Sequence, residues 1–349
     1  MKQKRAPLLI ILSLTILLLY GCNQNPQSRP QQQNNQVNEI AKIIVSMGNA
    51  SIDNYMFLQN QLTEMGKAAQ LEFVWLDARN DALQQAADLK KAPEEQAKVV
   101  IVEAVEPDML KAAIQELQKN GIKIICLGNL PADLPVDAFI TPDFQRAGEI
   151  QGQQVLTKAT GSKPLDVLIL RGPKDSTTAE NIVDGNLAAL QGNKNIGTVS
   201  IEEIAGWNAS TAFEVVKTAL AKSSPPQAIL CHSPEITAAA IQAVEQQGLV
   251  GQVQTYGMGT QSQAIDALEQ GKHTAEVDFM PEQLAQTLLE TAKSLSQGEG
   301  WSYERQIANG THNIPAKFIP IRSITIDNLY LLQSRMEKLK QDQAHGGNA

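Results

Sequence analysis

The chain has 349 residues, of which 43% are apolar and 19% are charged, so it is long enough and apolar enough for two ordinary globular domains. Its formal net charge of −8 argues against a nucleic-acid partner and against broad electrostatic adhesion to anionic lipid. Aromatic residues make up only 4% of the chain, so each exposed aromatic side chain gains weight as a candidate binding residue.

Residues 1–21 have the pattern of a secretory signal peptide. A basic start at residues 2–5 precedes an apolar run at 8–19, which is shorter than the ~20 residues needed to span a bilayer as a helix. The run leads into Leu-Leu-Tyr-Gly-Cys, which resembles the bacterial lipobox, and the resemblance implies that Cys22 is acylated and becomes the first mature residue. The alternatives are an ordinary signal peptide with a chance cysteine, or an uncleaved anchor. We predict an extracytoplasmic protein that is lipid-anchored to the bacterial cell membrane.

Residues 23–38 are almost entirely Asn, Gln, Pro and Ser. Such a segment cannot bury enough apolar surface to offset the entropy of ordering, so we expect Cys22 to be followed by a disordered tether up to residue 38. Its r.m.s. reach would be roughly 20–25 Å. The alternative is a low-complexity spacer without a role.

The other two cysteines, Cys126 and Cys231, each end an apolar run that is typical of a strand. An exported protein could pair them, but buried free thiols behave as small hydrophobic groups, and we favour two free thiols. The four histidines have no metal-ligand spacing with another histidine or cysteine. The sequence therefore predicts neither a metal site nor a cofactor.

From about residue 39, short apolar runs alternate with longer amphipathic segments, which predicts an α/β fold with a parallel sheet covered on both faces. The first predicted strands are Ile40–Ser46, Glu72–Leu76, Val99–Glu103, Ile122–Leu127 and Phe139–Thr141. The helices predicted among them are Tyr55–Ala69 and Pro107–Asn120.

The same alternation then restarts, which predicts a second doubly wound parallel-sheet lobe of similar size. Its predicted strands are Val167–Leu170, Val199–Ile204, Ala228–His232, Val253–Met258 and Thr274–Val277. Its predicted helices are Ile182–Leu190, Ala209–Ala221, Pro234–Gln247 and Gln261–Gln270. A further helix, Glu282–Ser296, and a final strand, Phe318–Ile326, follow. Ligands of open parallel sheets bind at the carboxyl ends of the strands, so we expect a binding cleft between the lobes.

Several motifs occur in a fixed order along residues 39–330. They are Lys42-Ile-Ile-Val-Ser, Gly121-Ile-Lys-Ile-Ile, Thr141-Pro-Asp-Phe-Gln-Arg-Ala-Gly148, Gly206-Trp207, Tyr256-Gly-Met-Gly259 and Ile324-Thr-Ile-Asp327. In this order they resemble the type I periplasmic binding proteins, specifically the ribose/galactose branch that serves ABC transporters. The resemblance implies a three-strand hinge, with lobe 1 formed by 39–142 and 280–310, and lobe 2 by 143–279 and 311–326.

The resemblance also implies a function without covalent chemistry. A monomer would capture a small sugar-like or less polar ligand by hinge closure and deliver it to an ABC permease. The rival hypothesis is a ligand-sensing or structural lipoprotein that presents one lobe state to a sensor kinase. No enzyme is predicted, because His232 and Ser233 are adjacent on an extended segment and point to opposite sides, and no Gly-x-Ser-x-Gly motif is present.

Sugar-binding members of the family line the cleft with charged and amide side chains and with stacking aromatic rings. This chain departs from that set, since Gly128, Gly259 and Phe279 stand where the family has charged or amide residues. The candidate ligand-binding residues are Asp143, Trp207, Asn129, Asn49, Ser233 and Phe279. We therefore predict a ligand less polyhydroxylated than a pentose or hexose, or a site that has lost its sugar.

Three of these candidates have alternative interpretations. Asp143 either accepts hydrogen bonds from a ligand or caps the following helix. Trp207 either stacks on a ligand, which we favour, or fills a hydrophobic gap in lobe 2. Phe279 either makes the hinge side of the cleft apolar or packs beneath the hinge.

Residues 327–343 predict an amphipathic carboxy-terminal helix. Leu329, Leu332, Met336 and Leu339 recur at three- and four-residue steps, and Arg335 is among the basic residues predicted on the other faces. The apolar face either packs on the protein's own lobe, which we favour, or binds a partner such as a sensor kinase or permease. Residues 344–349 predict a frayed end, which completes a tail over 327–349.

Overall fold

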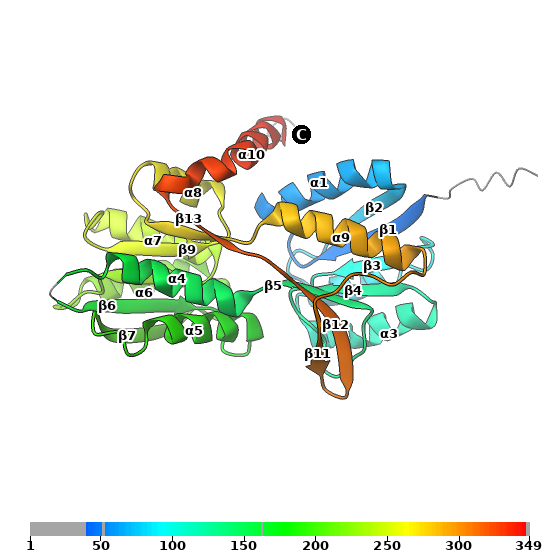
Figure 1. Ribbon diagram of the computed structural model, residues 1–349, viewed down its shortest axis with the longest axis horizontal. Helices are drawn as coiled ribbons and strands as arrows, with labels where there is room; N and C mark the ends of the chain where they lie inside the picture. The colour runs from blue at the N-terminus through cyan, green and yellow to red at the C-terminus, as the bar shows by residue number, and fades with distance from the viewer. Residues whose placement is uncertain (1–39, 51–52, 162, 347–349) are drawn as a thin grey trace, which may run out of the picture. The chain divides into compact units, whose positions relative to one another are not determined.

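A computed structural model describes residues 40–50, 53–161 and 163–346. The predictions for the signal peptide, Cys22 and the tether therefore lie outside the described residues. The described chain forms two β-sheets, here called sheet A and sheet B, and helices pack on both faces of each sheet (Figure 1). The predicted α/β class with two parallel-sheet lobes is confirmed.

Sheet A belongs to lobe 1, and its strand order is β11-β12-β5-β4-β3-β1-β2. Its strands are β1 (Ala41–Met47), β2 (Leu71–Asp77), β3 (Val99–Val102), β4 (Lys123–Leu127), β5 (Ala138–Pro142), β11 (Arg305–Asn309) and β12 (His312–Ile319). All neighbours pair in parallel except β11 and β12, which form an antiparallel hairpin.

Two buried clusters cover the two faces of sheet A. Helices α1 (Asp53–Ala69) and α9 (Pro281–Ser296) pack on one face, and α2 (Ala82–Leu89) and α3 (Lys111–Lys119) pack on the other. Strand β3 is buried along its whole length because it lies in the middle of the sheet between both layers. This explains why its sequence, Val-Val-Ile-Val, is continuously apolar.

Sheet B belongs to lobe 2, and its strand order is β13-β10-β9-β8-β6-β7. Its strands are β6 (Leu165–Arg171), β7 (Ile196–Glu203), β8 (Ala228–Cys231), β9 (Gln254–Met258), β10 (Ala275–Asp278) and β13 (Arg322–Ile324). Its helices are α4 (Phe144–Lys158), α5 (Thr177–Leu190), α6 (Ala209–Leu220), α7 (Pro234–Gln246) and α8 (Ser262–Glu269). Strand β13 is antiparallel to β10, and the other neighbours are parallel.

Two glycines let helices α4 and α5 pack closely. A Cβ atom on Gly148 would overlap the carbonyl of Ile182, and one on Gly185 would overlap the carbonyl of Gln145. Each glycine therefore sits against the backbone of the other helix, which explains why the pair needs a residue without a side chain at both positions.

The chain passes between the sheets three times, after β5, after β10 and after β12 (Figure 1). One predicted boundary is wrong. Residues 312–319 form β12, which pairs in parallel with β5 in sheet A, so they belong to lobe 1 and not to lobe 2. The predicted strand Phe318–Ile326 is in fact the end of β12, a short turn and β13, because the chain changes sheets at residues 320–321.

The carboxy-terminal segment begins with a 3-10 helix (Ile326–Leu332) and continues as α10 (Gln333–Gly346). A capping box between Thr325 and Asn328 starts it. Leu329, Leu332 and Met336 are buried against α8 and β13 of lobe 2, which confirms packing on the protein's own lobe for these three side chains.

The prediction that Arg335 lies on a polar face of the helix is wrong, because this residue is only 2% exposed. Its charge is compensated by the buried carboxylate of Asp278 and the partly exposed carboxylate of Glu282, which the helical periodicity could not reveal. Cys126 and Cys231 are both buried free thiols, as favoured. Over the described part of the chain, no helix combines the length and apolar character needed to cross a membrane.

Candidate functional site

The carboxyl ends of the parallel strands collect the candidate residues at one edge of each sheet. In sheet A, Asn49 follows β1, Glu103 follows β3 and Asn129 follows β4. In sheet B, Ser233 follows β8 and Phe279 follows β10. These edges are where open α/β sheets bind their ligands.

A hydrogen bond links the two edges directly. The Thr178 hydroxyl of α5, in lobe 2, donates a hydrogen bond to Asn129 Oδ1, in lobe 1, over 3.2 Å. Burial raises the pKa of Tyr55 in α1 well above its ordinary value, and the negative charges of Glu103 and Glu235 raise it further. Glu235 lies in the first turn of α7, so the charge of a lobe 2 residue acts on Tyr55 in lobe 1. The structure therefore brings Asn129, Tyr55 and Glu103 to the side of lobe 1 that meets lobe 2.

Glu103 is a site residue that the sequence analysis missed. Burial raises the pKa of its carboxyl to about 7, although a hydrogen bond donated by the Gly48 amide, at 2.7 Å, acts in the opposite direction. A Cβ atom on Gly48 would lie 2.8 Å from the same oxygen, so a side chain at position 48 would push the Glu103 carboxyl away. At neutral pH a carboxyl with this pKa is a mixture of acid and carboxylate, and it can both donate and accept hydrogen bonds.

Asp143 and Ser233 both cap helices. Asp143 Oδ1 accepts a hydrogen bond from the Arg146 amide, at 3.0 Å, and so caps α4. Ser233 Oγ accepts one from the Ile236 amide, at 3.3 Å, and so caps α7. The capping interpretation of Asp143 is confirmed, and binding of a ligand by either residue stays a prediction.

Trp207 is half-buried and has a left-handed backbone conformation, with φ 56°, after Gly206 with φ 61°. Its indole ring lies directly against Gly172, where a Cβ atom would overlap the ring, and it packs against the core cluster formed by β6, α6 and α7. The ring therefore does fill a hydrophobic gap in lobe 2. Stacking of the ring on a ligand stays a prediction.

Phe279 contacts Phe144 beside two of the segments that join the lobes. Their ring centroids are 5.7 Å apart, with an interplanar angle of 77°, which is a favourable edge-to-face arrangement. Both rings are half-buried. The pair packs on Met258 and Val277 of sheet B, so the packing interpretation of Phe279 is supported.

His232 belongs to a buried polar network behind the edge of sheet B. Its Nε2 lies 2.8 Å from Asn186 Oδ1, and the Asn186 amide donates to Gly148 O and to Gln151 Oε1. Burial and the nearby Arg171 lower the pKa of His232 to about 3, so the ring is neutral, and Nε2 is the donor because Asn186 Oδ1 can only accept. Ser233 has a separate partner, the Ile236 amide, so the two residues do not form a nucleophile–base pair.

Two surface grooves lie elsewhere on lobe 2. One, of about 1080 Å³, runs over the outer faces of α6, α7 and α8. The other, of about 910 Å³, lies between α6 and the β6–β7 edge. Neither groove is lined by any of the six predicted ligand-binding residues, and a helix exterior lacks the convergent strand ends described above. We therefore place the candidate site at the strand ends.

Among residues 40–50, 53–161 and 163–346, no group of three or more His, Cys, Asp or Glu side chains is arranged to hold a metal ion.

The chain is similar to several known binding proteins, in sequence or in structure. The chain is 24% identical over 244 residues to a D-xylose-binding periplasmic protein of Haemophilus influenzae, which covers 68% of this chain and 72% of that protein. A solute-binding protein of a Clostridium phytofermentans ABC transporter, solved with β-D-glucose, has 17% identity and a TM-score of 0.74 over 84% of this chain and 99% of its own. The Caulobacter myo-inositol-binding protein has 21% identity and a TM-score of 0.71 over 86% of this chain and 98% of its own.

These likenesses confirm the predicted type I periplasmic binding fold. The model of a family described as "periplasmic binding protein domain" matches residues 43–300, which is most of the chain. The chain belongs to this family of periplasmic binding protein domains.

Proposed function

We propose that this protein is an extracytoplasmic solute-binding lipoprotein of an ABC importer, and that it captures a small neutral polyhydroxylated ligand between its lobes. The observation that carries the proposal is the contact between the two carboxyl-terminal sheet edges, made by Thr178 and Asn129. A ligand held at both edges would favour the closed arrangement over any other, which is the basis of capture by hinge closure.

The polar groups at the edges favour hydroxyl-bearing ligands. Glu103 and Asp143 supply carboxyl oxygens, and Asn129 and Tyr55 supply further polar groups. Each hydroxyl that leaves water needs a replacement partner, and ionised acceptors make the stronger hydrogen bonds. The D-xylose-binding relative supports the same class of ligand.

The site offers little to an anionic ligand. Arg171, at the end of β6, turns back so that its guanidinium donates to the backbone carbonyls of Gly172, Pro173 and Lys174. The Phe144–Phe279 pair beside the hinge segments packs on sheet B and adds no positive charge. A neutral ligand therefore fits better than a charged sugar.

Cys22 and the polar segment that follows it support attachment to a membrane. A lipidated first residue and a flexible tether would keep the binding domain near a permease and let it reorient. A single acyl chain gives only marginal binding, so stable attachment requires more than one chain.

The decisive experiment is a ligand screen by thermal shift and calorimetry on the chain from residue 22 with Cys22→Ser. The first ligands are D-xylose, xylitol, myo-inositol and D-allose, followed by amino acids and short peptides. A ligand at a hundred times its dissociation constant adds about 2.7 kcal/mol of stability, which is a shift of several degrees. A shift with pentoses or polyols supports the proposal, and no shift with any class would favour the signalling alternative.

Two variants test whether a ligand found in the screen binds at the candidate site. Glu103→Gln is expected to weaken binding of a responsive sugar at least tenfold, because the site loses a charged acceptor. Glu106→Gln is the matched control, since Glu106 is exposed three residues further on and its side chain caps nothing. Equal affinities of both variants would remove Glu103 from the site.

A further inference from the structure

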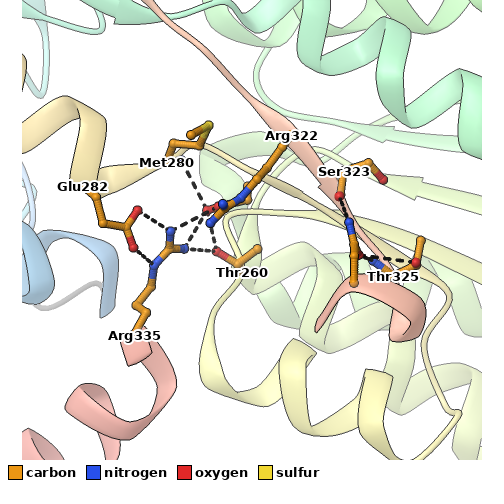
Figure 2. Close-up of polar contacts among 9 residues, drawn as sticks. Thr260, Met280, Glu282, Arg322, Ser323, Thr325 and Arg335 are labelled. Atoms are coloured by element: carbon orange, nitrogen blue, oxygen red, sulfur yellow. Dashed lines mark hydrogen bonds and ion pairs between the residues drawn. The ribbon is translucent and has the colours of Figure 1, made fainter. Parts of the chain in front are cut away.

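Arg335 of α10 is buried, and its guanidinium points toward Glu282 and Thr260 (Figure 2). Its Nη1 donates to Asp278 Oδ1 at 2.6 Å and to Thr260 Oγ1 at 3.1 Å. Its Nε and Nη2 donate to the two carboxyl oxygens of Glu282, at 2.8 and 2.6 Å, and Nη2 also reaches Asp278 Oδ2 at 3.1 Å. The planar guanidinium thus makes a two-bond pair with each of two carboxylates at once, a geometry that a lysine ammonium could not reproduce.

The two carboxylates belong to different lobes. Asp278 is the last residue of β10 in sheet B, and Glu282 is in the first turn of α9, which packs on sheet A. Three residues separate them, and the middle one, Met280, has a left-handed conformation with φ 48°. The Met280 amide also donates to Asp278 Oδ1, at 3.2 Å. Arg335 therefore bridges one of the three segments that join the lobes.

A second connecting segment reaches the same carboxylate. Arg322, the first residue of β13, follows the passage from sheet A to sheet B and donates from Nε to Asp278 Oδ2, at 2.8 Å. Burial by itself would raise the pKa of Asp278, but the hydrogen bonds and charges of Arg335 and Arg322 outweigh it and lower the pKa. Asp278 is therefore an anion at neutral pH that ties together two hinge segments and α10.

Helix α10 also contacts both lobes. Its apolar residues Leu332 and Met336 pack in the cluster with α8 and β13 of lobe 2. On the other side, Lys338 forms an ion pair with Glu64 of α1 in lobe 1, at 3.2 Å, and lies 5.8 Å from the ring centroid of Phe57. A change of angle between the lobes would have to alter these contacts or the Arg335 bridge.

We propose that Arg335 makes the carboxy-terminal helix a latch on the hinge, which stabilises the lobe arrangement in which Thr178 meets Asn129 and so raises affinity for the captured ligand. Arg335 touches no candidate ligand-binding residue, so it is a positioning residue. The effect on affinity rests on the proposed function, whereas the effect on lobe motion does not. If only a fraction of molecules is in the binding arrangement, the apparent dissociation constant rises in inverse proportion to that fraction.

The first test measures lobe motion without any ligand. Spin labels at Lys119→Cys in lobe 1 and Lys194→Cys in lobe 2, in the Cys22→Ser chain, report the distance between the lobes, since Cys126 and Cys231 are buried. Arg335→Met is expected to broaden or shift the distance distribution, and Arg335→Lys is expected not to restore it. An unchanged distribution in folded Arg335→Met would overturn the latch.

The second test uses D-xylose or whichever sugar the screen identifies. Arg335→Met is expected to raise the dissociation constant at least threefold, mainly through faster release. Lys340→Gln, an exposed charge on the same helix, and Val216→Ala, a core truncation in lobe 2 far from the hinge, control for charge and for lost stability. An affinity equal to that of the controls would overturn the effect on capture.

Glu282→Gln provides a milder change if Arg335→Met fails to fold. The Glu282 side chain is 41% exposed, and the buried Arg335 would keep its ion pair with Asp278 when Glu282 loses its charge. It removes only the lobe 1 half of the bridge, and the same direction of change in lobe distance is expected. If the unmutated protein binds no sugar, the proposed function fails, but the distance measurement still decides the latch.

Discussion

Glu103 is a carboxyl whose protonation near neutral pH follows from its position at the end of a buried strand. Burial raises its pKa from 4.5 to about 7 in the folded protein. The folded protein therefore binds more protons than the unfolded chain between these values, so this residue lowers stability as pH rises from about 4.5 to about 7, with no further loss above that.

Glu103→Gln should remove this loss, because the amide stays neutral and can still accept the Gly48 hydrogen bond. We expect the variant to exceed the unmutated protein by roughly 1–3 kcal/mol in unfolding free energy at pH 8, and to match it at pH 4.5. Urea unfolding at both pH values measures the difference, and Glu106→Gln should show none. The same gain at both pH values would mean that the charge of Glu103 is not its cause.

At the level of single residues, the sequence shows which residue type stands at each position of a helix or strand. It does not show which distant residues a side chain contacts, and those contacts decide what the side chain does. Asp143 has the sequence context of a helix cap, and the structure confirms that role. Arg335 has the sequence spacing of an exposed helix face, yet its side chain is buried. Two carboxylates that are distant from it in sequence compensate its charge. Glu103 could have been found as an acid that directly follows an all-apolar strand at a binding edge, but its pKa depends on burial by neighbours distant in sequence.

Among the elements, the close packing of α4 against α5 depends most directly on glycine residues, which have no side chain. Gly185→Ala would favour an isolated helix, since alanine has the higher helix propensity. In this protein the new Cβ would overlap the Gln145 carbonyl, so we expect a net loss of about 1–3 kcal/mol. Thermal unfolding measures this loss. Gly300→Ala, at a site with open space around it, should change stability little, and an equally stable Gly185→Ala would show that the helices can separate.

Elements with strong local patterns could be predicted, and those defined by distant pairing could not. Strands such as β3 and β8 are continuously apolar, and α9 carries a clear amphipathic pattern. The β11–β12 hairpin was missed because β11 is largely exposed and β12 alternates only weakly. The end of lobe 1 was misplaced for the same reason, since only pairing with β5 assigns β12 to sheet A.

For the whole molecule, the proposed anchor makes a prediction about location. Cys22→Ser should move the protein from the membrane fraction to the soluble extracytoplasmic fraction, because the acyl acceptor is lost. Fractionation with metabolic labelling by an alkyne fatty acid measures both location and acylation. Ser28→Ala, within the polar segment, should keep both, and labelling that persists in Cys22→Ser would contradict acylation at Cys22.

The pairing of β12 with β5 also has a consequence for the order in which the protein is made. Lobe 2 is drawn almost entirely from one continuous stretch, Phe144 to Asp278, whereas sheet A needs a strand from near the end of the chain. Until residue 319 has left the ribosome, β5 has no paired strand on one side. Helix α9, which packs on sheet A, has been synthesised only shortly before. We expect lobe 1, although encoded first, to finish folding last. If the protein is exported as an unfolded chain, as proposed, this order would keep it from completing its first domain before its last strand is synthesised.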